Sequence, residues 1–284
     1  MQSRPSPEPL RVRAPATTAN LGPGFDCAAA ALDLWNELEV SAGDEEQSEP
    51  EHLGVRAFAR IAPVEGRRFR WTSRIPRERG LGSSAAVIAL GLVAASLLQH
   101  GRADPEELFV HGLELEGHGD NLAAALAGGV CLTWENRIVR VADGPPAVPI
   151  AVVPETTVST AAARAALPET VPHADAAFSA GRATLLGAAL AGGSEELFAA
   201  ALEDRVHEPY RAAGAPLLGA IRAQLPAGAL GATLSGSGPT VIVWARAREA
   251  GACAAELEAL FPGERVLLLR AATAGAGVAA DERG

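Results

Sequence analysis

A glycine-rich loop that runs directly into a long apolar segment is the feature that most limits how this chain can fold. The stretch 79–98 reads RGLGSSAAVIALGLVAASLL, so Gly80 and Gly82 stand at the start of a helix that must be buried. Glycine weakens a helix or strand from within, and two here indicate close approach of the backbone to something else. Ser83 or Ser84 can cap the helix, whose first N–H groups lack internal partners and attract anions. The stretch fits a phosphate-binding loop and, equally well, an ordinary capped core helix.

Composition excludes several classes of protein. The chain has 284 residues, 48% of them hydrophobic, which suffices for one large domain or two ordinary ones. A net charge of −10 without any basic block disfavours nucleic acid and anionic membrane surfaces as partners. Three widely separated cysteines without a C-x-x-C pair fit a reducing cytoplasm and exclude a zinc ribbon. The apolar run Val87–Leu98 is too short to span a bilayer.

The absence of lysine narrows the chemistry further, because all 24 basic residues are arginine. A Walker A loop and the protein-kinase fold both need a lysine on the phosphates, and a Schiff-base mechanism needs one as well. A protein of this composition that binds nucleotide phosphates must use backbone N–H groups, arginine and a metal ion.

Strand-like and helix-like segments interleave without a simple βαβ rhythm, which predicts an α+β fold with two domains. We expect strands at 11–14 (ending at Pro15), 32–40, 67–72, 130–134, 137–141, 148–153 and 265–270, and a strand–turn–strand unit over 231–245. We expect helices at 84–99, from Asp104 to Gly117, within 118–129, at 160–166, 173–191 and 195–203, from about Pro209, and at 247–260.

A turn cluster at Asp143–Pro146 is the best domain boundary in the sequence. It predicts an N-terminal domain over 11–145 and a C-terminal domain over 146–284. Residues 1–10 carry three prolines and no apolar run, which is typical of a loose tail rather than a signal peptide. The acidic stretch 41–50 predicts a surface loop.

Three glycine-rich segments punctuate the chain: a first at Asn20–Asp26 (NLGPGFD), a second at Gly80–Ala86 (GLGSSAA) and a third at Leu234–Thr240 (LSGSGPT). Each lies at an expected strand end, where glycine lets the backbone approach a ligand or another loop. None fits the G-x-G-x-x-G pattern of dinucleotide-binding folds. Each alone is weak evidence, but three in order are far more specific.

With these segments the chain resembles the GHMP kinases, small-molecule kinases named for galactose, homoserine, mevalonate and phosphomevalonate. Residues 15–26, 75–86 and 234–240 match the three motifs of that family in order, and the resemblance covers about residues 11–270. The sequences NLGPGFD, EGHGDN at 116–121 and EPYR at 208–211 are most similar to the branch that phosphorylates homoserine. The resemblance implies a ribosomal-protein-S5-like first domain with a left-handed βαβ unit, a rare exception to the usual handedness, and a ferredoxin-like second domain.

The same resemblance implies transfer of the γ-phosphate of ATP to the hydroxyl of L-homoserine, with Mg²⁺ as the metal, as a step of threonine biosynthesis. It assigns the ATP phosphates to one continuous stretch: Pro76, Arg77, Glu78, Arg79, Gly80, Leu81, Gly82, Ser83, Ser84, Ala85 and Ala86. Backbone amides and a helix N-terminus are the donors that such a stretch offers to an anion. The sequence leaves the oligomeric state open, with a homodimer as one alternative.

Mg²⁺ favours oxygen ligands, so it needs a hydroxyl and a carboxylate here. The Ser84 hydroxyl is our first choice, with Ser83 as the alternative. By resemblance we assign the carboxylate to Glu114, while Glu116 is the nearby rival. Taken without the motif, Glu114 is better explained as part of a solvated helix face.

Polar residues that match the acceptor pocket of the family are Asn20, Asp26, His118 and Asn121. The carboxylate of Asp26 can pair with an ammonium, and the two asparagines, assigned with Asp26 as catalytic residues, can orient a hydroxyl or contact phosphate. Taken alone, Asn20 and Asp26 are better explained as turn residues that bond their own backbone, and His118 could be an ordinary loop histidine.

Thr160 and Arg164 stand four residues apart and share a helix face. By resemblance Arg164 and Arg211 grip the carboxylate of the acceptor, which guanidinium groups bind bidentately. A surface position is the alternative for Arg211. Ser179 stands where the family usually has asparagine or histidine, and no adenine-contacting residues can be placed between 41 and 71. Two rival functions remain: a GHMP kinase with a mevalonate, shikimate or sugar acceptor, and a catalytically silent relative that binds a metabolite.

Overall fold

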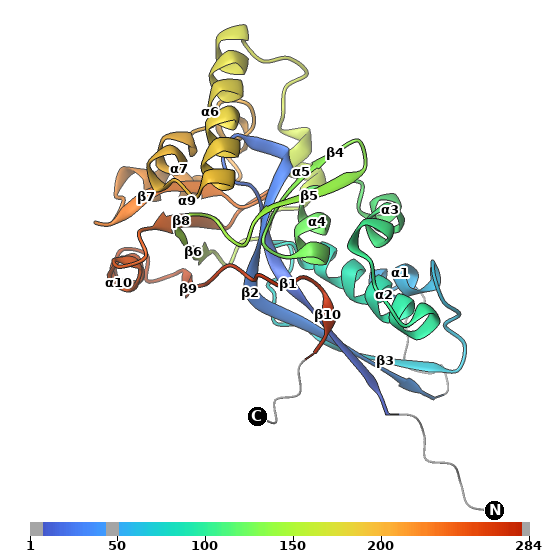
Figure 1. Cartoon of the computed structure of the whole chain (residues 1–284). Helices are drawn as coiled ribbons and strands as arrows, with labels where there is room; N and C mark the ends of the chain where they lie inside the picture. The colour runs from blue at the N-terminus through green and yellow to red at the C-terminus, as the bar shows by residue number, and fades with distance from the viewer. Residues whose placement is uncertain (1–7, 44–50, 280–284) are drawn as a thin grey trace, which may run out of the picture.

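The computed structural model describes residues 8–43 and 51–279, so the expected tail at 1–10 and loop at 41–50 lie largely outside the described residues. Two sheets carry the fold (Figure 1). The first sheet has six strands in the order β10-β1-β2-β4-β5, with β3 also paired to β2. Its strands are β1 (Leu10–Asn20), β2 (Gly24–Ala42), β3 (Arg67–Thr72), β4 (Val130–Trp134), β5 (Arg137–Ala142) and β10 (Gly277–Val278).

The second sheet has the order β7-β8-β6-β9, and all its neighbours are antiparallel. Its strands are β6 (Val148–Val153), β7 (Ala229–Leu234), β8 (Val241–Ala245) and β9 (Arg265–Leu268). Numbered within this half of the chain, the order is 4-1-3-2, with helices between the first and second strands and between the third and fourth. That arrangement is the ferredoxin-like topology that we expected.

Helices from the first half of the chain gather beside the first sheet (Figure 1): α1 (Leu53–Ala59), α2 (Ser83–His100), α3 (Pro105–Glu116) and α4 (Asp120–Ala127). The remaining helices lie between β6 and β9 in the chain: α5 (Thr160–Ala165), α6 (His173–Gly192), α7 (Glu195–Ala201), α8 (Glu208–Arg211), α9 (Pro216–Ala223) and α10 (Ala250–Leu260). The expected helix from about Pro209 is thus two short helices, α8 and α9.

Helix α2 is the centre of the first half. It packs against α1, α3, α4, β1 and β2, and most of its side chains are buried. Among the described residues it is the one helix whose length and hydropathy would let it cross a membrane, and 61% of it is buried inside the protein. Burial against helices and strands on several sides identifies it as a core helix.

The boundaries of α3 follow from local chemistry. The Asp104 side chain accepts hydrogen bonds from the N–H groups of Glu106 and Glu107, and Pro105 occupies the first turn. Gly117 ends the helix at a φ of 75°, which suits glycine. These are the start and end that the sequence predicts.

Strand β1 does not end at Pro15, where we expected a break. The strand continues to Asn20, and its register against β2 shifts between Pro15 and Ala16. A proline lacks the N–H that a regular ladder needs, and an irregular position accommodates it. Strand β2 is also longer than expected. The sequence did not reveal its first part, because residues 28–31 are four fully buried alanines that show no alternation of polar and apolar side chains.

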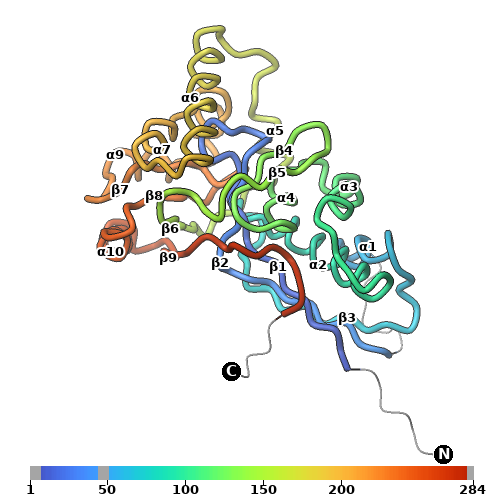
Figure 2. Tube along the Cα trace, viewed as in Figure 1, coloured from blue at the N-terminus to red at the C-terminus, as the bar shows by residue number. Residues whose placement is uncertain are grey.

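The last described segment returns to the first sheet, although we expected all of 146–284 to form the second domain. Ala272 N–H donates to Ala31, Ala276 N–H donates to Ala125, and β10 pairs with β1. The trace in Figure 2 shows the C-terminal segment running past β1 and β2. The two sheets therefore do not divide the chain into two continuous halves.

Candidate active site

The three glycine-rich segments meet at one cavity between the two halves of the fold. The first segment is the turn between β1 and β2, the second begins α2, and the third is the turn between β7 and β8. Residues from all three line the cavity, together with the α3–α4 connection, α5 and α8. Segments more than 200 residues apart in the chain thus form a single site.

Hydrogen bonds fix the third segment against the other two. Ser235 Oγ lies 2.6 Å from the carbonyl oxygen of Gly80 and 2.9 Å from Thr18 Oγ1. The Asn20 side chain donates to the Gly236 carbonyl at 3.0 Å, and Gly236 N–H donates to Ala19 at 3.2 Å. Because these bonds are buried, they set the distance between the loops.

The second segment owes its glycines to contacts within the protein. Gly80 and Gly82 have φ values of 77° and 64°. A Cβ on Gly80 would lie 2.1 Å from the Ser235 carbonyl oxygen, and one on Gly82 would lie 1.8 Å from Thr17 Oγ1. The glycines are therefore required by the close approach of Ser235 and Thr17, in addition to any approach of a ligand.

The start of α2 offers uncapped donors to the cavity. The helix begins at Ser83, and among the described residues no side chain caps its first N–H groups. Ser83 and Ser84 both line the cavity. An 18-residue helix with a free N-terminus attracts anions through these N–H groups and its dipole.

Glu116, and not Glu114, lies beside Ser84. Ser84 Oγ donates to Glu116 Oε2 at 2.7 Å, and both side chains line the cavity. Glu114 instead pairs with Arg60, its side chain is 61% exposed, and it is not among the cavity residues. Our choice of Glu114 is thus corrected by the geometry. Burial raises the pKa of Glu116, against a smaller opposing effect of the Ser84 hydrogen bond.

The stretch assigned to the ATP phosphates enters the cavity over Glu78–Ser84. Pro76 and Arg77 do not line it, and Ala85 and Ala86 are fully buried in the core. The guanidinium of Arg79 donates to the carbonyl oxygens of Pro154, Glu155 and Arg77. This arginine therefore joins the two halves of the protein.

Asp26 and Arg164 face each other across the cavity as a bidentate ion pair. Arg164 Nη1 and Nη2 donate to the two Asp26 carboxylate oxygens at 3.0 and 2.8 Å. Both side chains are 39% exposed. Arg164 Nε is buried and has no hydrogen-bond partner among the described residues.

Arg211 is nearly buried, with 6% exposure, and its orientation is fixed on two sides. Nε donates to the Ala163 carbonyl at 3.4 Å, and Nη1 donates to the Gly236 carbonyl at 3.1 Å and lies 3.2 Å from His207 Nδ1. Among the described residues, Nη2 has no protein partner. The alternative of a surface arginine is excluded by this burial.

The other predicted acceptor residues, Asn20, His118, Asn121 and Thr160, also line the cavity. Asn20 Oδ1 accepts from the Asp26 N–H at 3.1 Å, so this side chain does serve the turn. Asn121 Oδ1 accepts from Thr17 at 2.6 Å. Both asparagines therefore have protein partners that orient them.

Sequence reasoning missed Asp120, which lines the cavity and is only 4% exposed. Its Oδ1 accepts from the Asn121 N–H at 2.7 Å. Burial raises the pKa of Asp120 to about 6, with a further rise from the Asp26 charge. An acidic residue inside the EGHGDN sequence was the available signal.

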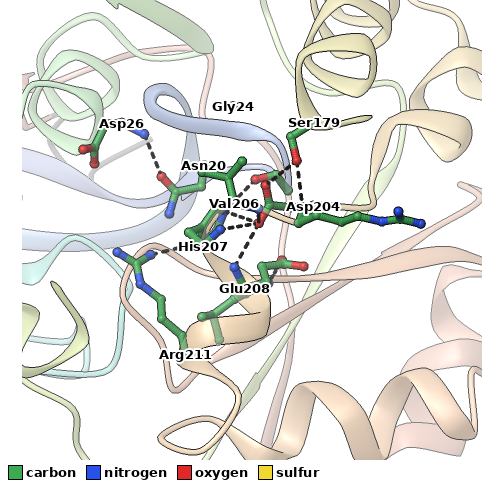
Figure 3. A network of polar contacts seen from close by, with 12 residues as sticks. Asn20, Gly24, Asp26, Ser179, Asp204, Val206, His207, Glu208 and Arg211 are labelled. Carbon is green, nitrogen blue, oxygen red and sulfur yellow. Dashed lines mark hydrogen bonds and ion pairs between the residues drawn. The ribbon is translucent and has the colours of Figure 1, made fainter. Parts of the chain in front are cut away.

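Ser179 and Asp204 form a buried support behind the cavity (Figure 3). Ser179 Oγ donates to Asp204 Oδ1 at 3.2 Å and accepts from the Arg205 N–H at 2.9 Å. Asp204 Oδ2 accepts from the N–H groups of Val206, His207 and Glu208, at the start of α8. Ser179 does not line the cavity, so its role is to hold the segment that carries Arg211.

Comparison with known proteins assigns the family. The model of the GHMP kinases N-terminal domain matches residues 52–129, and that of the GHMP kinases C-terminal domain matches residues 176–263. The chain belongs to the GHMP kinase family. A homoserine kinase from Streptomyces coelicolor is 41% identical over 84% of this chain and 85% of its own length.

Solved structures give the same assignment. A structure described as a putative homoserine kinase from Listeria monocytogenes is 31% identical, covers 96% of this chain and 100% of its own, and superposes with a TM-score of 0.80. The homoserine kinase from Cytophaga hutchinsonii has a TM-score of 0.86 at 24% identity, with 98% and 100% of the two chains covered, and supports the fold.

GHMP kinases use ATP with Mg²⁺, and the site has N–H groups that suit the phosphates and oxygen atoms that suit the metal. The uncapped start of α2 suits phosphate oxygens, and the Ser84 hydroxyl beside the Glu116 carboxylate suits a hard cation. Within residues 8–43 and 51–279, no group of three or more histidine, cysteine or acidic side chains could hold a metal alone. Two oxygen ligands are what Mg²⁺ needs when substrate phosphates supply others.

The buried Asp120 makes stability depend on pH in this GHMP kinase. The pKa of Asp120 in the folded protein, about 6, lies above the ordinary value of 3.8. The contribution of this group to the free energy of unfolding is therefore fully present below pH 3.8 and is lost as the pH rises through 6. Asp120→Asn keeps an oxygen for the Asn121 N–H. The variant should be more stable than wild type near pH 8, by up to about 3 kcal/mol, and lose this advantage near pH 4. Urea unfolding at both pH values measures this, and an equal difference at both would contradict it.

Proposed function

We propose that the chain transfers the γ-phosphate of ATP to the hydroxyl of L-homoserine, giving O-phospho-L-homoserine on the route to threonine. The carrying observation is the charge pattern of the cavity: Asp26, Arg164 and Arg211 line it together with the start of α2. Homoserine presents an ammonium, a carboxylate and a hydroxyl. One carboxylate and two guanidinium groups beside phosphate-binding amides suit such an acceptor. The resemblance to homoserine kinases supports the same acceptor.

An amino acid can replace the Asp26–Arg164 pair charge for charge. Its ammonium takes the place of Arg164 at the Asp26 carboxylate, and its carboxylate takes the place of Asp26 at Arg164. Nη2 of Arg211, which has no partner in the part of the chain that the structure describes, provides a second contact for that carboxylate. An acceptor with a single charge would open the pair and leave one group unpaired, which is costly in a partly desolvated site.

On the donor side, the first N–H groups of α2 hold phosphate oxygens, and Ser84 and Glu116 hold the metal. Mg²⁺ neutralises charge on the phosphates. Asp26 keeps its oxygens on a cation, whether guanidinium or ammonium, so its role is to position the acceptor. The hydroxyl proton passes to the γ-phosphate itself, while Asn20 and Asn121 orient the reacting groups. Positioning and electrostatics suffice for phosphoryl transfer.

The partners are thus two small molecules, L-homoserine and ATP, in the cytoplasm. The net charge of −10 disfavours nucleic acid and anionic membranes.

A panel of acceptors tests the proposed function. We expect phosphorylation of L-homoserine, detected as O-phosphohomoserine and ADP by coupled assay and phosphorus NMR. For 3-amino-1-propanol, which lacks the carboxylate, and 4-hydroxybutyrate, which lacks the ammonium, kcat/KM should be lower by at least about 30-fold, since each leaves a charge unpaired.

Two outcomes would overturn this proposal. A preference for mevalonate, shikimate or a sugar would assign another acceptor and leave the kinase class intact. Binding of MgATP without turnover of any acceptor would favour a catalytically silent relative.

The metal assignment predicts different outcomes for two glutamates on α3. Glu116→Gln should fold normally and lose most of its kcat, because an amide holds Mg²⁺ poorly beside a polyphosphate. Glu114→Gln is the matched control and should keep near-wild-type turnover, since Glu114 is exposed and pairs with Arg60. Turnover measured over a range of Mg²⁺ concentrations checks both. The reverse result would return the metal to Glu114.

A further inference from the structure

Arg211 is held by a partner that itself lies outside the cavity. Its Nη1 contacts the Nδ1 atom of His207, which is fully buried and does not line the cavity. We propose that His207, as the neutral Nε2–H tautomer, is a positioning residue that fixes the Arg211 guanidinium in the orientation that binds the acceptor carboxylate. This inference rests on the proposed function, because it gives Arg211 that role.

The hydrogen bonds of the ring determine its tautomer. Nε2 lies 2.8 Å from the Gly22 carbonyl oxygen, which can only accept, so Nε2 carries the hydrogen. Nδ1 lies 3.2 Å from a guanidinium nitrogen, which can only donate, so Nδ1 must present its lone pair. A doubly protonated ring would satisfy the first contact and oppose the second.

The position of the ring is set from three sides, of which Figure 3 shows that of Asp204. Asp204 caps the start of α8 and so fixes the backbone of His207. The Gly22 carbonyl belongs to the first glycine segment, and Phe25 of the same segment stacks on the ring at 4.9 Å with an angle of 20°. The Phe25 ring also contacts two guanidinium groups, that of Arg211 at 5.2 Å and that of Arg164 at 5.8 Å from the ring centroid. The ring therefore transmits the position of the first segment to Arg211.

Burial favours this neutral state, while the charges around the ring act in both directions. Asp204 Oδ2 lies 3.7 Å from Nε2, while Arg211 faces Nδ1 and Asp26 acts from a greater distance. Burial lowers the pKa of His207, with the Arg211 charge acting in the same direction and both carboxylates opposing it. Protonation at acid pH would place an N–H against the guanidinium and displace Arg211. Acceptor binding should weaken as pH falls, with no matching loss of nucleotide binding.

Two amide variants distinguish the contact made by Nδ1 from the contact made by Nε2. An asparagine amide reaches the place of Nδ1, so His207→Asn keeps an acceptor for Arg211. A glutamine amide reaches the place of Nε2, so His207→Gln keeps the donor for Gly22 and loses the Arg211 contact. We expect His207→Gln to raise the KM for L-homoserine about tenfold or more, and His207→Asn to raise it less. The KM for ATP should change little in either, which also verifies that the site has folded.

The dependence of the KM for L-homoserine on pH distinguishes a positioning role of His207 from a purely structural one. Burial lowers the pKa of His207 from the ordinary value of 6.5, so at saturating MgATP the wild-type KM for L-homoserine should rise as the pH falls below 6.5. This rise should be reduced in both variants because neither amide titrates. His173→Asn, at an exposed histidine on α6, is the control and should keep the wild-type profile. The proposal would be overturned if the two variants had equal KM values for L-homoserine and if this KM still rose at acid pH as in wild type.

Nitrogen NMR of the ring tests the proposal without any acceptor. In protein with labelled histidine, the signals missing from His207→Asn belong to His207. They should report a protonated Nε2 and an unprotonated Nδ1 near neutral pH. A protonated Nδ1 would refute the positioning role even if homoserine is the substrate. The expected tautomer in a protein that prefers another acceptor would refute the proposed function alone.

Discussion

The hydrogen bonds of Ser235 and Asn20 hold the third glycine segment against the other two, and the site depends on this contact. Ser235 joins the Gly80 carbonyl at 2.6 Å, and Asn20 joins the Gly236 carbonyl at 3.0 Å. The contact leaves no room for a Cβ at Gly80. Because the segments come from both sheets, the amides that we propose bind phosphate and the charges that we propose bind the acceptor are placed relative to each other by the fold itself.

The Asp26–Arg164 pair in the cavity presents the two charges for which, as we propose, an amino-acid acceptor substitutes. Asp26 and Arg164 pair with each other, so neither charge is left without a counter-charge. Arg211 is held through His207 and the Gly236 carbonyl, and α8 beneath it is capped by Asp204. A zwitterionic acceptor exchanges one set of ion pairs for another. Under the proposed function, selectivity for an amino acid follows from this exchange, with the hydroxyl left free to face the phosphates.

Local signals predicted much of the fold, and contacts distant in sequence account for the failures. The ends of α3 were predicted because Asp104, Pro105 and Gly117 act on neighbouring backbone groups. The glycine segments were located, but their contact through Ser235 was not, since it joins residues 155 apart. The choice between Glu114 and Glu116 failed for a geometric reason: two residues on a helix differ by about 200° in direction, so one faces the cavity and the other faces solvent. The return of the C-terminal segment to β1 has no local signal at all.

The most direct test of this account is the affinity for MgATP when the Ser235 contact is removed. Ser235 does not line the cavity, so Ser235→Ala touches no ligand. Ser96→Ala is the matched control, because it also removes a hydrogen bond from a buried serine to a carbonyl, at the far end of α2. Both variants should lose about 1–3 kcal/mol of unfolding free energy. Calorimetric titration should show MgATP binding weakened about tenfold or more in Ser235→Ala and unchanged in Ser96→Ala. Wild-type affinity in Ser235→Ala would contradict the claim that contacts between the glycine segments create the site.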